Sequence, residues 1–166
     1  MKIISVEKIT LNIGTGEPGD KLAKAIKLLN MVSGAKSAAT KSKRRIPTWG
    51  IRPGLEIGCK VTLRKKIAEE KLRDLLKAVG NKLKDTNFDD GGNFSFGIHE
   101  YLDIPNVKYD ASIGIIGLEV AVTLKRPGFR IKYRKLKKAT IGKKHAIRKE
   151  EAKKFMIEKF NVGIEE

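Results

Sequence analysis

The sequence predicts one α+β domain, and three observations support this fold class. Several short segments alternate apolar and polar residues, which is typical of strands that are buried on one face. Other segments carry apolar stripes at helical spacing. No regular series of strand–helix units runs along the chain, so a doubly wound parallel sheet is not expected. With 166 residues, the chain has the length of one domain with a sizeable core.

The N-terminal part predicts a strand, a turn and a helix. Residues 6–13 alternate apolar and polar side chains, as expected for a half-buried strand. A turn rich in glycine follows. Residues 20–33 then carry an apolar stripe, with Asp20 as the expected N-cap and Gly34 placed to end the helix.

The segment of residues 36–64 joins strand signals to a basic loop. Prolines and glycines interrupt residues 42–56, so a long exposed loop without secondary structure is expected there. Trp49 lies at its tip among arginines and lysines, where its ring could stack on a nucleobase beside phosphate contacts. The alternative is that Trp49 folds back over the core. Residues 57–64 then predict a strand with Cys59 on its core side.

The rest of the chain predicts two more helices and two more strands. An apolar stripe predicts a helix over residues 68–83. Alternation predicts a strand over residues 94–98, and a run rich in Ile, Val and Gly predicts a long strand over residues 113–124. A last amphipathic helix is expected over residues 149–160, with apolar side chains spaced to dock.

The charge of the chain indicates a polyanionic partner. Lys and Arg number 36 against 19 Asp and Glu, which gives a net charge of +17. Such a surplus is expected to be neutralised by the phosphates of a nucleic acid, with binding that weakens steeply as salt rises. The basic residues are densest after residue 124, where no acid occurs before Glu150 and Phe129 and Tyr133 are interleaved. We therefore divide the chain into a core of residues 1–124 and a basic extension with a C-terminal helix, residues 125–166.

Other function classes find little support in the sequence. Cys59 is the only cysteine, so no internal disulfide forms, and burial explains it better than catalysis. His99 and His145 lack partners at metal-ligand spacing, and no catalytic constellation is recognisable. We expect no enzyme activity, no cofactor, no metal and no membrane association, and a cytoplasmic protein.

Two alternatives stay open from the residues alone. Gly14, Gly16 and Gly19 match the G-x-G-x-x-G pattern between a strand and a helix, which would suit a dinucleotide-dependent enzyme. The acidic residue that should hold the ribose is missing, and no strand–helix series follows. The second alternative is a general basic nucleic-acid-binding module.

Several segments, in order along nearly the whole chain, resemble the family of large-subunit ribosomal protein number five. The matching segments of the core are Ile9-Thr10-Leu11-Asn12-Ile13-Gly14 with Gly16-Glu17, Thr40-Lys41, Gly50-Ile51-Arg52, Gly58-Cys59-Lys60-Val61-Thr62-Leu63-Arg64, Gly97-Ile98 with Glu100, Tyr109-Asp110 and Gly117-Leu118-Glu119-Val120. The end of the chain is similar to the archaeal and eukaryotic branch, through Arg126-Pro127-Gly128-Phe129, Ile141-Gly142-Lys143-Lys144-His145 and Lys149-Glu150-Glu151-Ala152.

The resemblance implies a fold, a set of partners and a function. It implies an antiparallel sheet with helices packed on one face, and a structural constituent of the large ribosomal subunit. The sheet would bind 5S rRNA and help to attach it in the central protuberance, and the loop of residues 42–56 would contact P-site tRNA. Further partners would be large-subunit rRNA, neighbouring large-subunit proteins, and a small-subunit protein across an intersubunit bridge.

The candidate site residues fall into three groups. Those expected at rRNA are Asn12, Gly14, Gly16, Thr40, Lys41, Lys60, Thr62 and Arg64. Those expected at tRNA, in the loop, are Lys43, Arg44, Arg45, Trp49 and Arg52. Those expected to bind phosphates from the basic extension are Arg126, Arg130, Arg134, Lys143 and Lys144.

Overall fold

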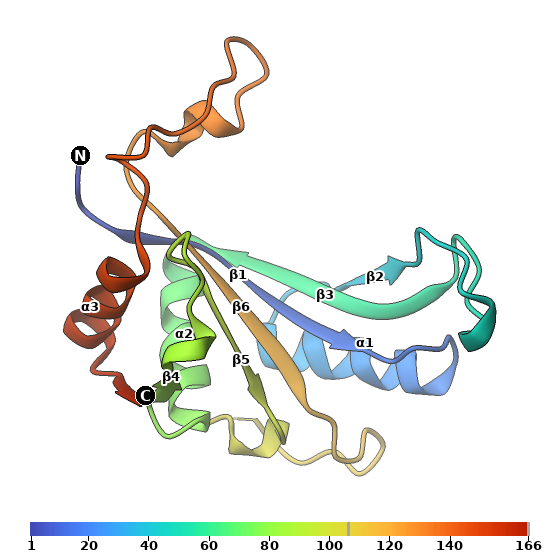
Figure 1. Cartoon of the computed structure of the whole chain (residues 1–166). Helices are drawn as coiled ribbons and strands as arrows, with labels where there is room; N and C mark the ends of the chain where they lie inside the picture. Colours follow the sequence, from blue (N-terminus) through green and yellow to red (C-terminus); the bar gives the residue numbers. More distant parts are fainter. Residues whose placement is uncertain (106, 166) are drawn as a thin grey trace.

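A five-stranded antiparallel sheet, covered on one face by helices, forms the centre of the protein (Figure 1). The computed structural model describes residues 1–105 and 107–165. The strands of this sheet, in spatial order, are β2 (Ala38–Lys41), β3 (Glu56–Arg64), β1 (Ser5–Gly14), β6 (Leu118–Lys125) and β5 (Phe94–Ile98). The helices are α1 (Asp20–Ser33), α2 (Lys65–Ala78) and α3 (Lys149–Phe160). The expected α+β fold is confirmed.

A second, two-stranded sheet lies beside α3 and was not expected. It pairs β4 (Lys82–Lys84) with β7 (Gly163–Glu165) in parallel. The short pairing ties the end of the chain to the segment that follows α2.

The core lies between the large sheet and the helices. Ile9, Leu11 and Ile13 of β1 point into it, as their alternation predicted. Leu29 of α1 and Leu72 of α2 are fully buried against the same face. Because one face of the sheet is sealed in this way, the polar side chains that alternate with the apolar ones point to the opposite, outward face.

Three predicted boundaries are wrong, for reasons of backbone geometry. The second helix ends at Ala78, since Gly80 and Asn81 take left-handed φ angles of 66° and 55°. The strand expected from residue 113 begins at Leu118, because Gly114 turns the chain with φ 76°. Gly19, in place of the expected Asp20, is the N-cap residue of α1.

The basic loop has the expected extent, but it contains regular structure that was not expected. The Ser42 N–H donates to the Leu55 carbonyl (2.8 Å), and Ile46 and Ile51 form a bridge across the loop. A 3₁₀ turn over Pro47–Trp49 closes its tip. Trp49 is 73% exposed there, so the alternative that it covers the core is wrong.

The C-terminal helix docks as predicted. Ala152, Met156 and Phe160 are buried. Lys149 Nζ lies 2.7 Å from Asp85 Oδ2, and Lys153 pairs with the same carboxylate. These ion pairs hold the start of α3 against the turn that follows β4.

Cys59 is fully buried, and burial raises the pKa of its thiol to about 11 from an ordinary value of 9.0. The raised pKa favours the neutral thiol. At a pH below both pKa values, each unit by which the pKa rises lowers the thiolate fraction tenfold. We expect the native protein to carry roughly a hundredfold less thiolate at pH 8 than the unfolded chain. A thiol-reactive chromogenic disulfide, added with and without denaturant, measures this. Equal labelling rates would show that Cys59 is accessible in the native state.

Candidate nucleic-acid interface

The outward face of the sheet brings the predicted polar contacts together. Thr10 of β1 lies opposite Thr62 of β3, and Asn12 lies opposite Lys60. Leu11, between them, points into the core. Asn12 and Thr62 are therefore diagonal neighbours on the same face, because alternate residues of paired strands share a face. Thr62 is exposed and Asn12 is half-exposed, so both can meet a ligand.

A neighbouring strand fixes the orientation of Asn12. Its Nδ2 donates to Glu119 Oε2 of β6 at 3.1 Å. This bond uses one amide N–H, and the amide also carries a second N–H and a carbonyl oxygen that RNA can contact. A short, oriented amide suits readout of base edges or 2′-hydroxyls.

The glycine-rich turn lies at the end of this polar face. The N–H groups of Thr15 and Gly16 both donate to the Ile57 carbonyl (3.0 Å), which ties the turn to β3. A Cβ at Gly58 would lie 2.7 Å from the Ile13 oxygen and 3.0 Å from Thr40 Oγ1. Glycine at residue 58 therefore lets the backbones approach closely and places Thr40 at the same end of the sheet as the turn.

The turn does not belong to a dinucleotide-binding fold. Its G-x-G-x-x-G match joins β1 to α1, but β1 is antiparallel to both of its neighbours, β3 and β6. The dinucleotide site requires a parallel sheet whose carboxyl ends form a crevice. The structure thus removes the fold on which that alternative rests.

Among the described residues, the basic side chains on this face form only long ion pairs. Lys41 Nζ lies 3.7 Å from Glu56 Oε1, and Arg64 Nη1 lies 3.8 Å from Glu7 Oε1. The pair of Lys41 and Glu56 is exposed and contributes little to stability, whereas the Glu7 partner of Arg64 is largely buried. Lys41 and the exposed Lys60 can therefore turn to phosphates at small cost.

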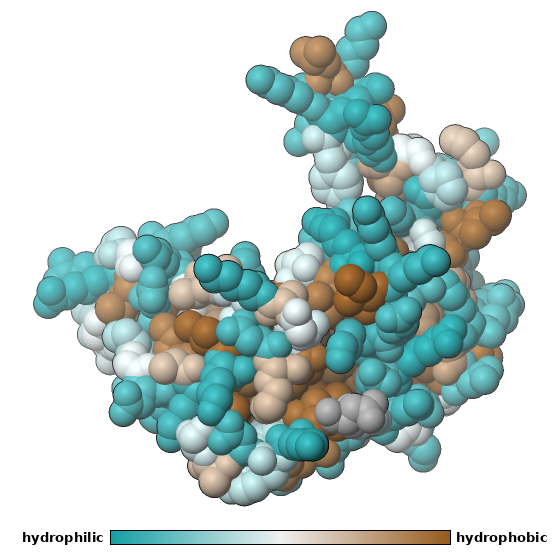
Figure 2. All heavy atoms as spheres, turned by 180° about the vertical axis from the view of Figure 1, so that it is seen from behind, coloured by the Kyte–Doolittle hydropathy of each residue, from teal (hydrophilic) through white to brown (hydrophobic). Residues whose placement is uncertain are grey.

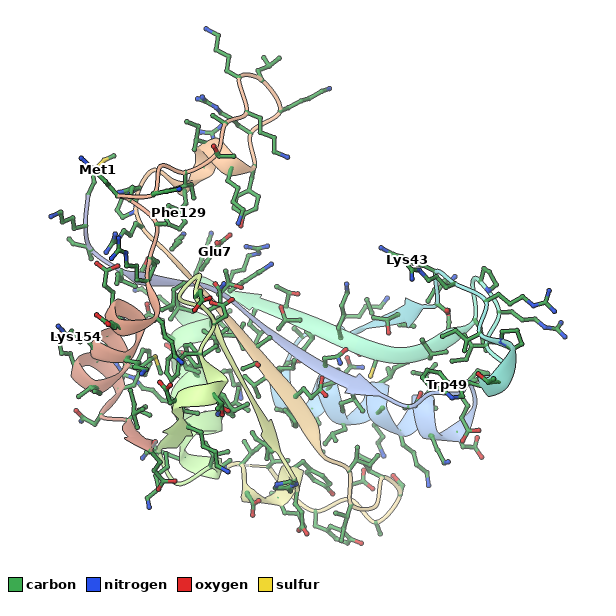
Figure 3. All side chains as sticks on the ribbon, viewed as in Figure 1. Met1, Glu7, Lys43, Trp49, Phe129 and Lys154 are labelled. Carbon is green, nitrogen blue, oxygen red and sulfur yellow. The ribbon has the colours of Figure 1, made fainter. Side chains whose placement is uncertain are left out.

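The basic loop lies at one end of β1 and β3. Trp49 and Lys43 are both on this loop, far from the other basic segment (Figure 3). Arg44, Arg45 and Arg52 are exposed around the same tip. An exposed aromatic ring surrounded by cations can stack on an unpaired base while the cations contact the neighbouring phosphates.

The basic extension forms an arm at the opposite end of the strands. Residues 126–148 leave β6, pass through a 3₁₀ turn at Phe129–Lys132 and return to α3. The arm stands clear of the body of the protein and carries mostly hydrophilic side chains (Figure 2). Its exposed predicted phosphate ligands are Arg130, Arg134, Lys143 and Lys144.

Arg126 departs from the prediction. We expected it to bind phosphate, but the residue is 5% exposed and its guanidinium faces inward. It donates to the carbonyls of His145 (3.3 Å) and Ala146 (3.2 Å) and to Glu151 Oε1 (2.7 Å). Arg126 thus links the first residue of the arm to the segment where the arm ends. Its role is structural, because its burial leaves no room for a ligand.

Within the described parts of the chain, no cluster of side chains is arranged as a metal centre. Residues 1–105 and 107–165 contain no group of three His, Cys, Asp or Glu side chains placed to hold a metal ion. In the same residues, no helix combines the length and apolar character needed to cross a bilayer. The described residues form a polar sheet face that lies between a basic loop and a basic arm.

Comparison with known proteins finds matches along nearly the whole chain. Residues 1–52 match the family model of ribosomal protein L5, and residues 56–155 match the model of the C-terminus of the same ribosomal family. The large ribosomal subunit protein uL5 of Sulfurisphaera tokodaii is 50% identical over 167 residues, covering 100% of this chain and 94% of that protein. The protein of the same name from Nanoarchaeum equitans is 50% identical over 165 residues, with coverages of 99% and 97%. That from Methanococcus aeolicus is 44% identical over 164 residues, with coverages of 97% and 91%.

Proposed function

The chain belongs to the ribosomal protein L5 family, and from this premise we propose that it binds 5S rRNA through the outward face of its sheet. Membership confirms the resemblance drawn from the sequence motifs. It also makes the chain a structural constituent of the large ribosomal subunit, with rRNA and ribosomal proteins as its partners, in the cytoplasmic ribosome.

The observation that carries the 5S rRNA proposal is the common placement of Asn12 and Thr62. Both side chains point away from the helices, on adjacent strands and two residues apart in register. Had either been sealed in the core, the surface would have lost its polar centre. The glycine-rich turn and Thr40 extend this surface toward the basic loop.

In the proposed mechanism, affinity and fit have different sources. Lysines and arginines of the face and the arm contact phosphates, and release of counterions from the RNA favours binding. Asn12 and Thr62 then distinguish one RNA surface from another, since short polar side chains can meet base edges and 2′-hydroxyls closely.

The basic loop supports a second contact in the same proposal. Trp49 and the surrounding arginines project from the end of the sheet, away from the arm (Figure 3). We assign this loop to P-site tRNA, and we assign the remaining surfaces to neighbouring large-subunit proteins and to a small-subunit protein across an intersubunit bridge.

A gel-shift titration with 5S rRNA over a salt series tests the proposal. The slope of log K against log salt reports the number of phosphates that the protein neutralises. Competition with duplex DNA at one fixed salt concentration separates the proposal from a general basic nucleic-acid-binding module, which would show little preference. Equal competition by duplex DNA and 5S rRNA would contradict it.

Asn12→Ala and Thr62→Ala should each weaken 5S rRNA binding by about 1 kcal/mol, roughly fivefold, because each removes a polar contact to RNA. Neither variant should unfold the protein, since both side chains lie on the outward face. Thr86→Ala, at an exposed threonine in the turn before β5, is the matched control. Unchanged affinity in both Asn12 and Thr62 variants would remove this face from the interface.

A further inference from the structure

A carboxylate lies within the face that we assign to 5S rRNA. Glu119 of β6 is exposed, and in register it lies opposite Asn12 of β1 on one side and Gly97 of β5 on the other. β6 runs between these two strands (Figure 1). Cβ atoms of directly opposite residues are roughly 5 Å apart. An RNA that contacts Asn12 therefore also comes close to Glu119.

One oxygen of the Glu119 carboxylate is free to meet a ligand. Oε2 accepts the hydrogen bond from Asn12 Nδ2 (3.1 Å), which orients the carboxylate. The described residues provide no donor to Oε1 and no ion pair to Glu119. Because the residue is exposed, a group from outside the protein can reach Oε1.

Glycines keep space open beside this carboxylate. Glu119, Gly97 and Gly117 are among the residues that line a hollow of about 390 Å³. A Cβ at Gly97 would have no atom within 4 Å, so a side chain at that position would occupy open space above the sheet. A Cβ at Gly117 would lie 2.8 Å from the carbonyl oxygens of both Ile98 and His99, so glycine lets β6 begin close to the end of β5. The volume is within the range of pockets that hold small organic groups, about 300–1,000 Å³, and suits one edge of a nucleotide.

The charge of Glu119 favours a hydrogen-bond donor over a phosphate. An ionised carboxylate only accepts hydrogen bonds, and it repels phosphates. In a chain with a net charge of +17, electrostatic attraction alone would favour a neutral or basic residue on an RNA-binding face. RNA offers donors that a carboxylate can accept from, namely base amino groups and ribose 2′-hydroxyls. Lys60 lies opposite Asn12 on its other side, so a base for phosphates and an acceptor for donors flank the same amide.

We propose that the hollow beside Glu119 receives a hydrogen-bond donor of the RNA, a base amino group or a ribose 2′-hydroxyl, and that Glu119 Oε1 accepts from it. Glu119 is then a residue that determines which RNA surface fits, while the basic residues supply affinity. The inference rests on the 5S rRNA binding proposed above.

Glu119→Gln tests the contact through the sign of its effect. The glutamine carbonyl can still accept from Asn12, but an NH₂ group then replaces Oε1 in the hollow. The variant should bind 5S rRNA about tenfold more weakly, because a hydrogen bond to a charged acceptor is lost. Electrostatics alone predicts tighter binding, since a negative charge is removed. Glu70→Gln, at an exposed position on α2, is the matched control and should bind at least as tightly as the wild type.

The same substitution in an Asn12→Ala background separates a direct contact from an effect on Asn12. A direct contact predicts that Glu119→Gln still weakens binding severalfold when residue 12 is alanine. If the effect disappears in that background, Glu119 acts only by orienting Asn12, and the inference is overturned.

Modified 5S rRNA identifies the donor. Each transcript carries, at one random position, a nucleotide that lacks one donor: a 2′-deoxynucleotide, inosine for guanosine, or the riboside of purine or pyrimidin-2-one for adenosine or cytidine. The bound and unbound fractions are sequenced for the wild type and for Glu119→Gln. A position where the analogue weakens binding of the wild type but not of the variant marks the donor, and the kind of analogue distinguishes a ribose hydroxyl from a base amino group.

Tighter binding by Glu119→Gln would show that Glu119 only repels phosphate, and it would overturn the inference. The absence of any position whose effect depends on Glu119 would overturn it as well. The proposed 5S rRNA function fails separately, if duplex DNA competes equally with 5S rRNA for the wild-type protein.

Discussion

Glu151→Ala is expected to lower the free energy of unfolding by about 2–3 kcal/mol. Glu151 Oε1 accepts from the Arg126 guanidinium (2.7 Å), and Oε2 accepts from the Arg148 backbone N–H (3.0 Å) at the start of α3. A hydrogen bond between charged groups contributes about 1.5–3 kcal/mol, less where water screens it, and a lost helix cap costs about 1 kcal/mol. The variant also leaves the buried Arg126 without its counter-charge, which is costly.

Chemical denaturation followed by circular dichroism measures the effect, and the adjacent residue supplies the control. Glu150 lies in the same first turn of α3 and is exposed. Glu150→Ala removes the same charge and loses only its favourable interaction with the helix dipole, about 0.3–1 kcal/mol. Equal losses in both variants would show that the link between Glu151 and Arg126 is unimportant.

The same residue predicts a pH dependence of stability. The backbone N–H of Arg148, and then the Arg126 guanidinium, lower the pKa of Glu151 from its ordinary value of 4.5. A carboxyl whose pKa is lower in the folded state stabilises the fold above its unfolded pKa. That contribution is lost as the pH falls from about 4.5 through the folded pKa. The difference between wild type and Glu151→Ala should therefore shrink in acid, whereas a constant difference would point to packing alone.

The sequence predicted the elements that bury one face and expose the other. β1, β3, β5 and α3 match their expected ranges closely, because the core fixes the period of their apolar residues at two or at 3.6. Ranges were wrong where apolar residues are buried beyond the true end of the predicted element. Leu83 lies in β4 beyond the end of α2, and Ile113 is buried in a turn before β6.

Strand pairing could not be read from these periods. β1 lies between β3 and β6, which are distant in the chain, and β4 and β7 are only three residues long. Alternation shows which face a residue takes, so Asn12 and Thr62 could be placed outward. It does not show which strand lies beside it, and the antiparallel sheet came from the family resemblance.

Two acids near the base of the arm, Glu151 and Glu7, were not predicted to interact there because their partners, Arg126 and Arg64, are distant in the sequence. Arg126 and Glu151 are 25 residues apart, and nothing local marks Arg126 as buried within a run of exposed bases. Glu7 looked like one polar residue of an alternating strand, but a bulge opposite β6 redirects it. A hint was available in the alternation itself, since Val6 and Ile9 both point inward although they are three residues apart.

Replacing four exposed basic side chains of the arm with glutamine should have the largest effect on RNA binding. The substituted residues are Arg130, Arg134, Lys143 and Lys144. If each neutralises one phosphate, their loss lowers the slope of log K against log salt by about 3. Over an approximately fourfold rise in salt, the wild-type protein would then lose about sixtyfold more affinity for 5S rRNA than the variant loses.

Net charge alone must be separated from the position of that charge. A matched variant carries four glutamines in place of basic residues of α2, which lies on the helix-covered side of the sheet. The substituted residues are exposed or half-exposed: Lys66, Lys71, Arg73 and Lys77. Both variants have the same net charge, so a long-range field would weaken binding equally in both. If the arm contacts phosphates directly, the salt slope changes only in the arm variant, because counterions are released only where a basic side chain contacts the RNA. Equal salt slopes in the two variants would show that the arm does not lie against the RNA, and its anchoring through Arg126 would then need another explanation.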